Sequence, residues 1–339
     1  MMEVLLEKLC MSRAVSGLEE DVAGIVSKEL APYVDEVYYD NLGNLIMKKD
    51  GTGPGPRILI AAHMDEIGGM VKYIDDEGFI YFIEVGSHDP AMLLGSRVAF
   101  ERNVLGIVSR KTKGNELKIG DLYIDIGAKG KDEVEMLGIR QGSVFSRAPS
   151  YQRLAGTRRV SKSFDNRAGV CVMAEVLKRL DNFNGHLMAV ATCQEEVGTR
   201  GSKVLSNYAE ADIAIVLDVT FAVDTPQRVS PKDINTFLGK GPAITLKDDH
   251  FMMSPKMRRF VEGVAKGRGL PLQYDISPGG TDAGPIYLSK NGIPTVAMLV
   301  PLRYMHTGNE IIDLDDLENC VRLLIGIIEN AEKQGSSGP

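Results

Sequence analysis

The sequence predicts an α/β protein, with a doubly wound, mostly parallel sheet that has helices on both faces and a small all-β barrel domain inserted into it. Three observations predict this fold class. Four apolar runs lack polar alternation, which is typical of strands buried on both faces. Helical patterns separate these runs, and strands that alternate with helices form parallel sheets. A stretch of short, alternating segments interrupts the series, which indicates an insertion.

The first elements are a helix and a hairpin. "SGLEEDVAGIVSKEL" (16–30) opens on Ser16 and has Glu19 three residues later, the pattern of a capping box ahead of a helix. "DEVYYDNLGNLIMKK" (35–49) predicts two strands around a tight turn at 41–44.

The buried strands and their helices follow. The four apolar runs are "RILIAA" (57–62), "LMAVATC" (187–193), "DIAIVL" (212–217) and "IPTVAMLV" (293–300). Helices are predicted over 166–180, 254–269 and 282–292, and the amphipathic stretch 314–333 closes the fold.

Residues 70–160 break this alternation. Their short strands are predicted at 78–86, 96–103, 104–111 and 121–128, and only 131–138 looks helical. A crossover between parallel strands needs far fewer residues, so this segment is predicted to be an inserted β-barrel. The expected domains are a discontinuous catalytic domain (1–69 and 161–331), the insertion (70–160) and a disordered tail (332–339).

Composition narrows the classes of function. The chain has 339 residues, 44% of them hydrophobic, and a net charge of −7 without a long basic block, so neither nucleic acid nor a membrane is an expected partner. The start does not read as a signal peptide, and no apolar run reaches the ~20 residues of a membrane span. The four scattered cysteines are interpreted as buried free thiols, which indicates a cytoplasmic protein.

Side chains able to bind a metal follow each of the four runs. His63 and Asp65 follow the first run, and Asp218 follows the third. The adjacent pair Glu195 and Glu196 follows the second run, and the segment after the fourth run ends in His306. Ligand sites in doubly wound sheets lie at the carboxyl ends of the strands, so these residues are expected to meet. Asp165, just before a helix, is a further candidate, with a plain N-cap as the alternative.

The donor types indicate the metal. Imidazole and carboxylate without thiolate suit zinc, cobalt or manganese. Two histidines and at least three carboxylates exceed what one catalytic zinc needs, whereas two metals that share a bridging carboxylate would use them all. Asp65 lies two residues after His63, so in an extended chain it shares a face with that imidazole and is expected to accept its other N–H.

At this point the chain resembles the dinuclear-metal aminopeptidases of the tetrahedral (TET) glutamyl/deblocking family, some members of which carry endoglucanase or cellulase names. The resemblance covers nearly the whole chain and rests on motifs that occur in a specific order: "AAHMDEIG" (61–68), "DLYIDIGA" (121–128), "KSFDNRAG" (162–169), "CQEEVGTRG" (193–201), "LDVT" (217–220), "GKGPAI" (239–244), "SPGGTDAG" (277–284) and "YMHTGNE" (304–310).

The resemblance implies residue roles. Asp165 corresponds to the carboxylate that bridges both metals, Glu196 and His306 to the other ligands of one metal, and His63 and Asp218 to those of the second. Glu195 resembles the general base, Asp65 the residue that orients His63, and the loop of Gly279, Gly280 and Thr281 a substrate-facing segment. Because side chains alternate along an extended chain, Glu195 is expected to point away from the direction of Glu196.

The expected activity is hydrolysis of the N-terminal residue from peptides that have a free N-terminus, with two zinc or cobalt ions (manganese is a further option), a metal-bound water as nucleophile and Glu195 as base. The resemblance also implies a homo-oligomer, a dodecamer built from dimers through the inserted barrel. The preferred N-terminal residue depends on loops such as 221–237, whose path the sequence does not define.

Three alternatives stay open. A related two-metal carboxypeptidase or deacylase would carry a lid that mixes strands with two helices, whereas this insertion reads as β-only. A glycoside hydrolase would use the carboxylate pair, but the chain has no Trp for sugar platforms and such an enzyme has no use for the two histidines. A shell protein with structural metal would not need a spare base such as Glu195.

Overall fold

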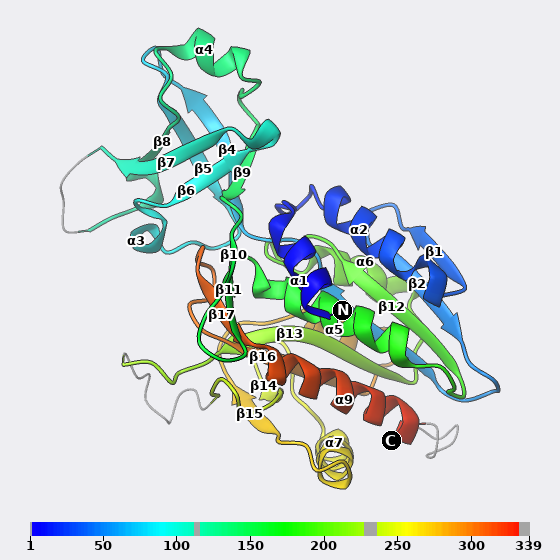
Figure 1. Cartoon of the computed structure of the whole chain (residues 1–339). Coiled ribbons are helices and arrows are strands. Elements are labelled where there is room, and N and C mark those ends of the chain that lie inside the picture. The colour runs from blue at the N-terminus through cyan, green and yellow to red at the C-terminus, as the bar shows by residue number, and fades with distance from the viewer. Residues whose placement is uncertain (1, 112–115, 227–235, 332–339) are drawn as a thin grey trace.

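The computed structural model describes residues 2–111, 116–226 and 236–331. Within these ranges the chain forms a sheet-and-helix body and a separate closed barrel (Figure 1). The fold class predicted from the sequence is therefore confirmed. The predicted disordered tail, 332–339, lies outside the described residues.

The body is built on an eight-stranded mixed sheet, in the order β1-β2-β12-β3-β13-β16-β14-β15. The central strands β12, β3, β13 and β16 run parallel, as do β14 and β15, whereas β1, β2 and the β14–β16 pair join antiparallel. The bounds are β1 (Glu36–Tyr39), β2 (Leu45–Asp50), β3 (Arg57–His63), β12 (His186–Thr192), β13 (Ile213–Phe221), β14 (Ala243–Lys247), β15 (Gln273–Ile276) and β16 (Thr295–Leu302).

The four apolar runs of the sequence form these four central strands. In β3, every residue after Arg57 is buried, because helices cover both faces of the sheet. The predicted hairpin at 35–49 is confirmed as β1 and β2. The edge strands β14 and β15, however, were not predicted as members of this sheet, because they are short.

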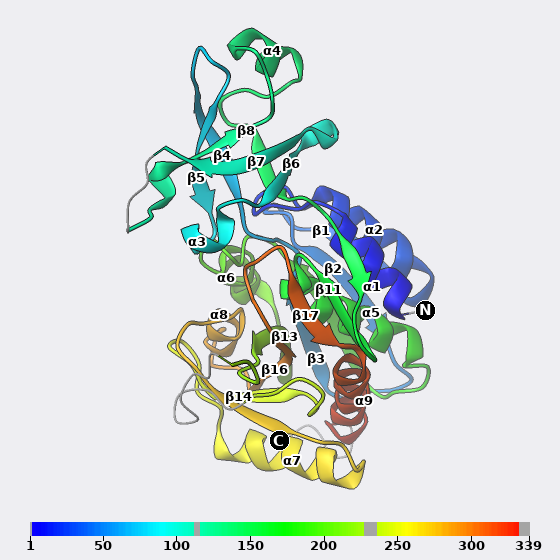
Figure 2. The same ribbon diagram turned by 60° about the vertical axis from the view of Figure 1, so that its left-hand side comes forward.

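Helices cover the two faces of the sheet (Figure 2). On one face, α5 packs on β3 and β13, with α1 and α2 outside it and α9 beside it. On the other face lie α6 and α8, and α7 packs against α9. These helices are α1 (Met2–Met11), α2 (Glu20–Leu30), α5 (Phe164–Arg179), α6 (Arg200–Tyr208), α7 (Pro255–Gly267), α8 (Ala283–Tyr287) and α9 (Leu314–Ala331).

Burial follows this layering. The whole stretch 164–177 of α5 is buried, since the sheet covers one side of the helix and other helices cover the other side.

The capping box predicted at Ser16 is wrong: α2 begins at Glu20 with Glu19 at its N-cap. The Ser16 hydroxyl instead donates to a carboxylate at the end of β3, a tertiary contact that local sequence does not reveal. Helix α6 was also not predicted.

The barrel closes in the order β4-β5-β8-β7-β6-β9. Its own hydrophobic core is separate from that of the body, as expected for an independently packed unit. The strands are β4 (Gly68–Ile74), β5 (Ile80–Val85), β6 (Arg97–Phe100), β7 (Leu105–Arg110), β8 (Leu122–Asp125) and β9 (Val144–Arg147), with the short helices α3 (Pro90–Leu93) and α4 (Lys131–Met136).

A three-stranded sheet connects the barrel back to the body. It consists of β10 (Tyr151–Arg153), β11 (Arg158–Ser161) and β17 (Glu310–Asp313), in that order. Because β11 leads directly into α5, this sheet lies beside the start of α5.

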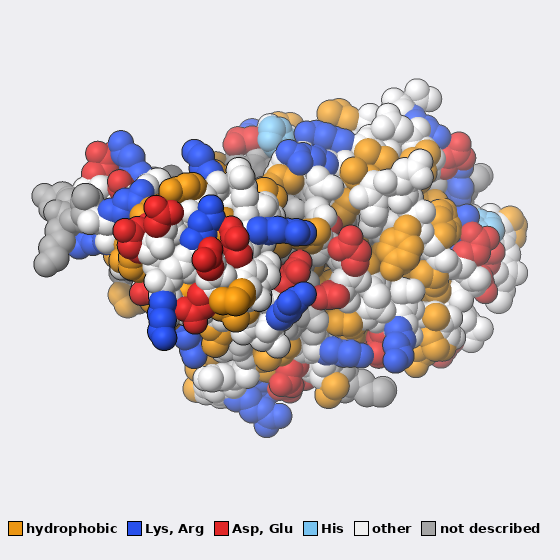
Figure 3. Space-filling view, turned by 90° about the horizontal axis from the view of Figure 1, so that it is seen from above, with side chains coloured by type: hydrophobic (Ala, Val, Ile, Leu, Met, Phe, Trp, Pro, Cys, Tyr) orange, Lys and Arg blue, Asp and Glu red, His pale blue; other side chains and the backbone are white. Residues whose placement is uncertain are grey.

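On the face seen in Figure 3, acidic and basic side chains are interspersed over both units. Among the described residues, none of the helices combines the length and apolarity that a bilayer-crossing segment requires.

Candidate metal centre and active site

The carboxyl ends of β3 and β13 place the first two candidate ligands. His63 is the last residue of β3, and Asp218 lies within β13, which continues three residues further. The parallel register pairs Val216 with Ala61, so two residues further along each strand Asp218 comes level with His63. The His63 Nε2 atom is 3.6 Å from Asp218 Oδ1.

Asp165 lies between the two histidines. Its Oδ1 is 3.2 Å from His63 Nε2, and its Oδ2 is 3.3 Å from His306 Nε2. Asp165 does not cap α5: the backbone at 165 and 166 is non-helical, and the Asn166 side chain accepts the Gly169 N–H at 3.0 Å, as an N-cap does. The plain N-cap alternative for Asp165 is therefore wrong.

His306 and Glu196 complete a second group. His306 lies in the segment between β16 and β17, and its Nε2 is 3.3 Å from Glu196 Oε2. Two sets of side chains thus offer ligand atoms within 4.8 Å of one another: His63, Asp165 and Asp218, and Asp165, Glu196 and His306. Both sets contain Asp165.

The donor chemistry and spacing fit divalent ions. Ligands that bind zinc tetrahedrally at ~2.0–2.1 Å lie about 3.3 Å apart, and the four imidazole–carboxylate distances run from 3.2 to 3.6 Å. Nitrogen and carboxylate oxygen without sulfur suit zinc, cobalt or manganese. The residues present therefore fit two metal ions that share Asp165.

The electrostatics also favour cations in this site. Burial and the nearby Asp165 raise the pKa of Glu196 to about 7. Burial lowers the pKa of His306, but Asp165 and Glu196 outweigh it and raise that pKa to about 11. Buried acids in such density are costly unless positive charge compensates them, and two divalent ions would supply it.

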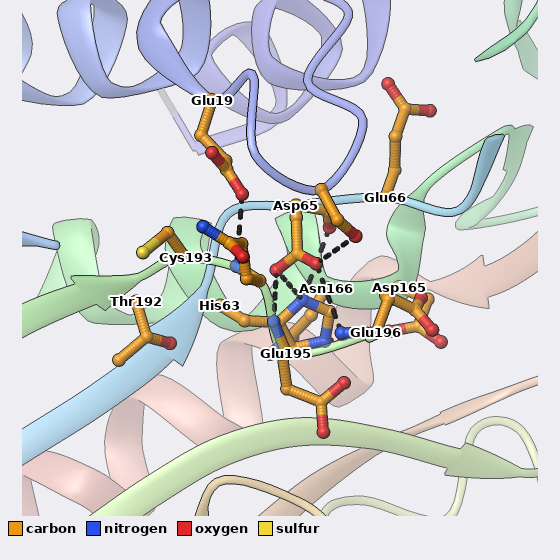
Figure 4. Close-up of polar contacts among 12 residues, drawn as sticks. Glu19, His63, Asp65, Glu66, Asp165, Asn166, Thr192, Cys193, Glu195 and Glu196 are labelled. Atoms are coloured by element: carbon orange, nitrogen blue, oxygen red, sulfur yellow. Dashed lines mark hydrogen bonds and ion pairs between the residues drawn. The ribbon is translucent and has the colours of Figure 1, made fainter. Parts of the chain in front are cut away.

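Asp65 is the centre of a hydrogen-bond network (Figure 4). Its Oδ1 accepts the backbone N–H of Glu195 at 2.9 Å, and its Oδ2 accepts that of Glu196 at 3.1 Å and the Ser16 hydroxyl at 2.6 Å. The His63 Nδ1 atom is 3.4 Å from Asp65 Oδ1 and 3.2 Å from the Asp65 carbonyl oxygen. Asp65 thus touches His63 and the backbone of both glutamates.

The two glutamates differ in direction. In Figure 4 the Glu195 side chain points away from Asp65, whereas Glu196 lies beside Asp165. The expected reason was wrong: β12 ends at Thr192, and Gln194 has a left-handed φ of 55°, so the pair stands on a turn beyond the extended strand. Burial is the main cause that raises the pKa of Glu195 well above its usual value.

The site opens into a cavity of about 210 Å³. Six of the seven site residues line it; Asp65 lies behind them. The predicted substrate-facing loop, Gly279, Gly280 and Thr281, also lines the cavity. Of the 221–237 loop, Phe221 lines it, and residues 227–235 lie outside the described part of the chain.

Sequence reasoning missed several residues around this site. Glu310 accepts the backbone N–H of Asp165 at 3.1 Å and that of His306 at 2.9 Å. Its only signal was its place in "YMHTGNE", four residues after His306. Asp248 and Asp275 line the cavity from β14 and β15. For Asp248 the signal was again an acid after an apolar run, but that run is short. Asp275 lies inside its strand, where this signal does not apply.

Comparison with known proteins places this chain in a family. The M42 glutamyl aminopeptidase family model matches residues 43–323, so the chain belongs to that family. The chain is a metal-dependent aminopeptidase, a hydrolase that acts on peptide bonds. The resemblance inferred from the sequence motifs is confirmed.

The similarity to individual proteins spans the whole length. The chain is 39% identical to a putative aminopeptidase from Acetivibrio thermocellus, over 96% of this chain and 97% of that protein. It is 33% identical to the lysyl aminopeptidase of Pyrococcus furiosus, over 96% of each chain. The structure of the TET1 peptidase of Pyrococcus horikoshii, described as able to assemble into a tetrahedron or a large octahedral shell, is 30% identical, with a TM-score of 0.86 and coverage of 97% and 99%.

Proposed function

We propose that this protein removes the N-terminal residue from peptides with a dinuclear metal centre. The observation that carries the proposal is Asp165, whose two oxygens each face a different histidine. Asp165 would be shared by the two ions, His63 and Asp218 would hold one of them, and Glu196 and His306 would hold the other. When bound, the ions supply polarisation of the scissile carbonyl and a water of lowered pKa.

Glu195 is the general base in this proposal. It lines the cavity beside the metal ligands without belonging to either ligand group. Its carboxylate takes a proton from the attacking water and gives it to the leaving amine. A raised pKa suits that task, since a group that both accepts and releases a proton works best near the operating pH.

Asp65 orients His63 and the backbone of the two glutamates in this proposal. Its carboxylate lies beside the His63 imidazole N–H and holds the backbone of both glutamates. A carboxylate behind a metal-binding histidine sets the orientation and basicity of the ring. The loop of Gly279, Gly280 and Thr281 lies across the cavity and contacts the substrate backbone.

The resident metal is zinc or cobalt, with manganese as a further option, because each accepts this oxygen and nitrogen donor set. Exhaustive chelation is expected to abolish hydrolysis of aminoacyl-anilides, and added zinc or cobalt to restore it. Metal content by mass spectrometry is measured beside the rate. Full activity in a preparation shown to be metal-free would overturn the proposal.

The free N-terminus is part of the recognised substrate. In this proposal the α-amino group would bind beside the residues that hold the metals, which would account for removal of one terminal residue. A peptide and its Nα-acetylated form are compared by chromatography, and the acetylated form is expected to be cleaved far more slowly. Equal cleavage of both would favour the deacylase or endopeptidase alternatives.

Other observations weigh against the rival activities. The cavity of about 210 Å³ falls below the ~300–1,000 Å³ typical of drug-sized ligand pockets, which favours one residue side chain over a sugar chain. A glycoside hydrolase would leave His63 and His306 without a role. The insertion is not β-only, since it contains α3 and α4, but these helices have only four and six residues. Its strands close into a barrel, and this closure distinguishes it from the strand-and-helix lid of the two-metal carboxypeptidases.

We further propose that residues 70–160 form an inserted domain and that copies of this chain associate through it, into a dodecamer built from dimers. Tyr73, Ile83, Leu105 and Ile107 expose apolar side chains on the barrel, each 45% to 55% accessible. Such side chains are candidates for burial between subunits. The Pyrococcus horikoshii peptidase can assemble into a tetrahedron, which supports a similar assembly for this chain.

The buried free thiols support a cytoplasmic location.

A further inference from the structure

Two carboxylates line the cavity without belonging to the metal groups. Asp248 follows β14, and Asp275 lies in β15. They are 5% and 2% exposed, respectively. β14 and β15 are parallel neighbours, and Thr245 pairs with Asp275, so both acids stand at the same end of this strand pair.

Asp248 has one oxygen that nothing satisfies. Its Oδ1 accepts the backbone N–H groups of His250 and Phe251, both at 2.6 Å. Its Oδ2 is buried and has no hydrogen-bond partner among the described residues. A buried acceptor without a donor costs free energy, so a donor from a ligand would bind there favourably.

Asp275 is held by hydroxyl groups. Its Oδ1 accepts from Thr220 at 2.8 Å, and its Oδ2 accepts from Ser277 at 2.8 Å, with Thr245 at 3.5 Å. Hydroxyl donors orient a carboxylate, but they bring no positive charge to it.

Basic side chains do not offset these charges. Within 2–111, 116–226 and 236–331, neither Lys nor Arg lines the cavity. Lys247 is the neighbour of Asp248 in the chain, but its ammonium donates to the backbone carbonyl of Asp248 at 3.0 Å. The wall of this part of the cavity is therefore acidic without a Lys or Arg partner, and the buried Asp248 Oδ2 lacks a donor.

We infer that Asp248 and Asp275 line the pocket for the side chain of the substrate's first residue and that the enzyme prefers lysine or arginine there. This inference rests on the proposed aminopeptidase function. A basic side chain brings a cation and donors to Asp248 Oδ2, where a charge-assisted hydrogen bond in a dry site is strong. A glutamate side chain would meet like charge, so it is disfavoured although the family is described as glutamyl.

A rival assignment gives these acids the substrate's α-ammonium group instead. The two assignments differ in what the carboxylates recognise. An α-ammonium contact is common to all substrates, whereas a side-chain contact serves basic residues alone. Lysine and norleucine anilides separate the two, because norleucine has an unbranched carbon chain like that of lysine and lacks the terminal ammonium.

The first experiment measures kcat/KM of the metal-loaded enzyme on lysine, norleucine and glutamate anilides. Lysine is expected to exceed norleucine by about 10-fold or more, the scale of one charged hydrogen bond, and glutamate to be poorest. Norleucine equal to or better than lysine would overturn the inference while leaving the aminopeptidase function standing. Failure to hydrolyse any anilide would overturn the proposed function, and the inference with it.

The second experiment compares Asp248→Asn with Asp249→Asn. Asp249 is the matched control: it is exposed, and its Oδ2 accepts the Gly279 N–H at 3.0 Å from outside the cavity lining. Asp248→Asn is expected to lower kcat/KM for lysine by about 10- to 100-fold and to leave norleucine unchanged, whereas Asp249→Asn keeps the ratio of the two.

The norleucine rate of each variant reports that the fold and metal site are intact. Asp275→Asn provides an independent second variant, with the same selective loss expected. Equal losses for lysine and norleucine in Asp248→Asn would favour the α-ammonium assignment and overturn the inference. An unchanged ratio in both Asp248→Asn and Asp275→Asn would also overturn it.

Discussion

Two adjacent glutamates have different surroundings in this site. Glu196 Oε2 lies 3.3 Å from His306 Nε2 and belongs to a group of side chains that could hold a metal ion. Glu195 points elsewhere and belongs to neither group. The turn after β12, with Gln194 in the left-handed region, separates the two side chains, and Asp65 fixes the backbone of both.

The first prediction separates the two glutamates by mutation. Glu195→Gln keeps size and hydrogen bonding but removes the proton-accepting carboxylate, so both metals should stay bound while kcat falls by about 10²–10⁴-fold. Glu196→Gln removes an anionic ligand, so occupancy of one site should fall and excess metal should partly restore the rate. Mass spectrometry of metal content is combined with steady-state kinetics.

The opposite pattern, with metal lost only in Glu195→Gln, would reverse the two assignments. Unchanged kcat in both variants would mean that the reaction takes place elsewhere.

His88 gives a pH-dependent prediction. Burial, together with nearby Arg147, lowers its pKa to about 4, and its Nε2 lies 2.7 Å from the Gly68 carbonyl. The unfolded chain, with an ordinary pKa of ~6.5, binds the proton first as pH falls. The stability that neutral His88 contributes is therefore present above pH ~6.5 and lost as pH falls towards ~4, by about 3 kcal/mol.

His88→Gln removes this titration. The difference in unfolding free energy between wild type and variant, from denaturant titrations at pH 7.5 and pH 4, should change by that amount. His186→Gln, at an exposed histidine on β12, is the control. A difference that stays constant across this range would show that His88 is not kept neutral by burial.

At the scale of elements, the small sheet β10-β11-β17 aligns the metal site. Ser161 at the end of β11 pairs with Glu310 at the start of β17. This pairing brings Glu310 beneath the chain that enters α5, where its carboxylate holds the backbone of Asp165 and His306 together. Two proposed metal ligands from distant parts of the sequence are thus fixed by one buried side chain.

Replacement of Glu310 tests this arrangement. In Glu310→Gln one acceptor becomes an N–H₂ donor that faces a backbone N–H, so the two ligands should separate. Metal affinity is expected to fall by about 10- to 100-fold, the usual effect of losing a group that supports metal ligands. Competition with a chelator of known affinity measures it.

Glu318→Gln on α9 is the comparison, because Glu318 is paired with Arg179 on the surface. If Glu310→Gln binds metal as tightly as Glu318→Gln, the role assigned to Glu310 is wrong.

At the scale of the whole molecule, the barrel projects from the catalytic body (Figure 1). The barrel also carries exposed apolar side chains. Ile83 on β5 and Ile107 on β7 are 48% and 45% exposed. If the barrel mediates association, Ile83→Asp with Ile107→Asp should place charges in a buried interface and shift the protein to smaller species. Light scattering coupled to gel filtration measures this.

Val4→Asp is the control, since Val4 is 71% exposed on α1, away from the barrel. An unchanged mass for the Ile83 and Ile107 double variant would assign the contact to another surface.

The amino-acid pattern by itself determined the α/β class, the four central strands, the barrel and the residues that meet at the metal site. Buried parallel strands need uninterrupted apolar runs, and their carboxyl ends meet at one edge, so residues that follow such runs were predicted to be neighbours. These signals are local, or they repeat along the chain. They can therefore be recognised without knowing which residues are in contact in the folded protein.

Three features were decided only by the tertiary structure. They are the contact of Ser16, the hydrogen bonds of Glu310 to two backbone N–H groups, and the place of Asp248 and Asp275 in the cavity wall. Ser16 matched a helix cap locally, yet its hydroxyl donates to Asp65, 49 residues away. Glu310 and Asp165 are 145 residues apart and come together through strand pairing. Asp248 has an unfilled oxygen because the surrounding chain buries it, and burial of a single polar atom depends on packing that no local pattern encodes.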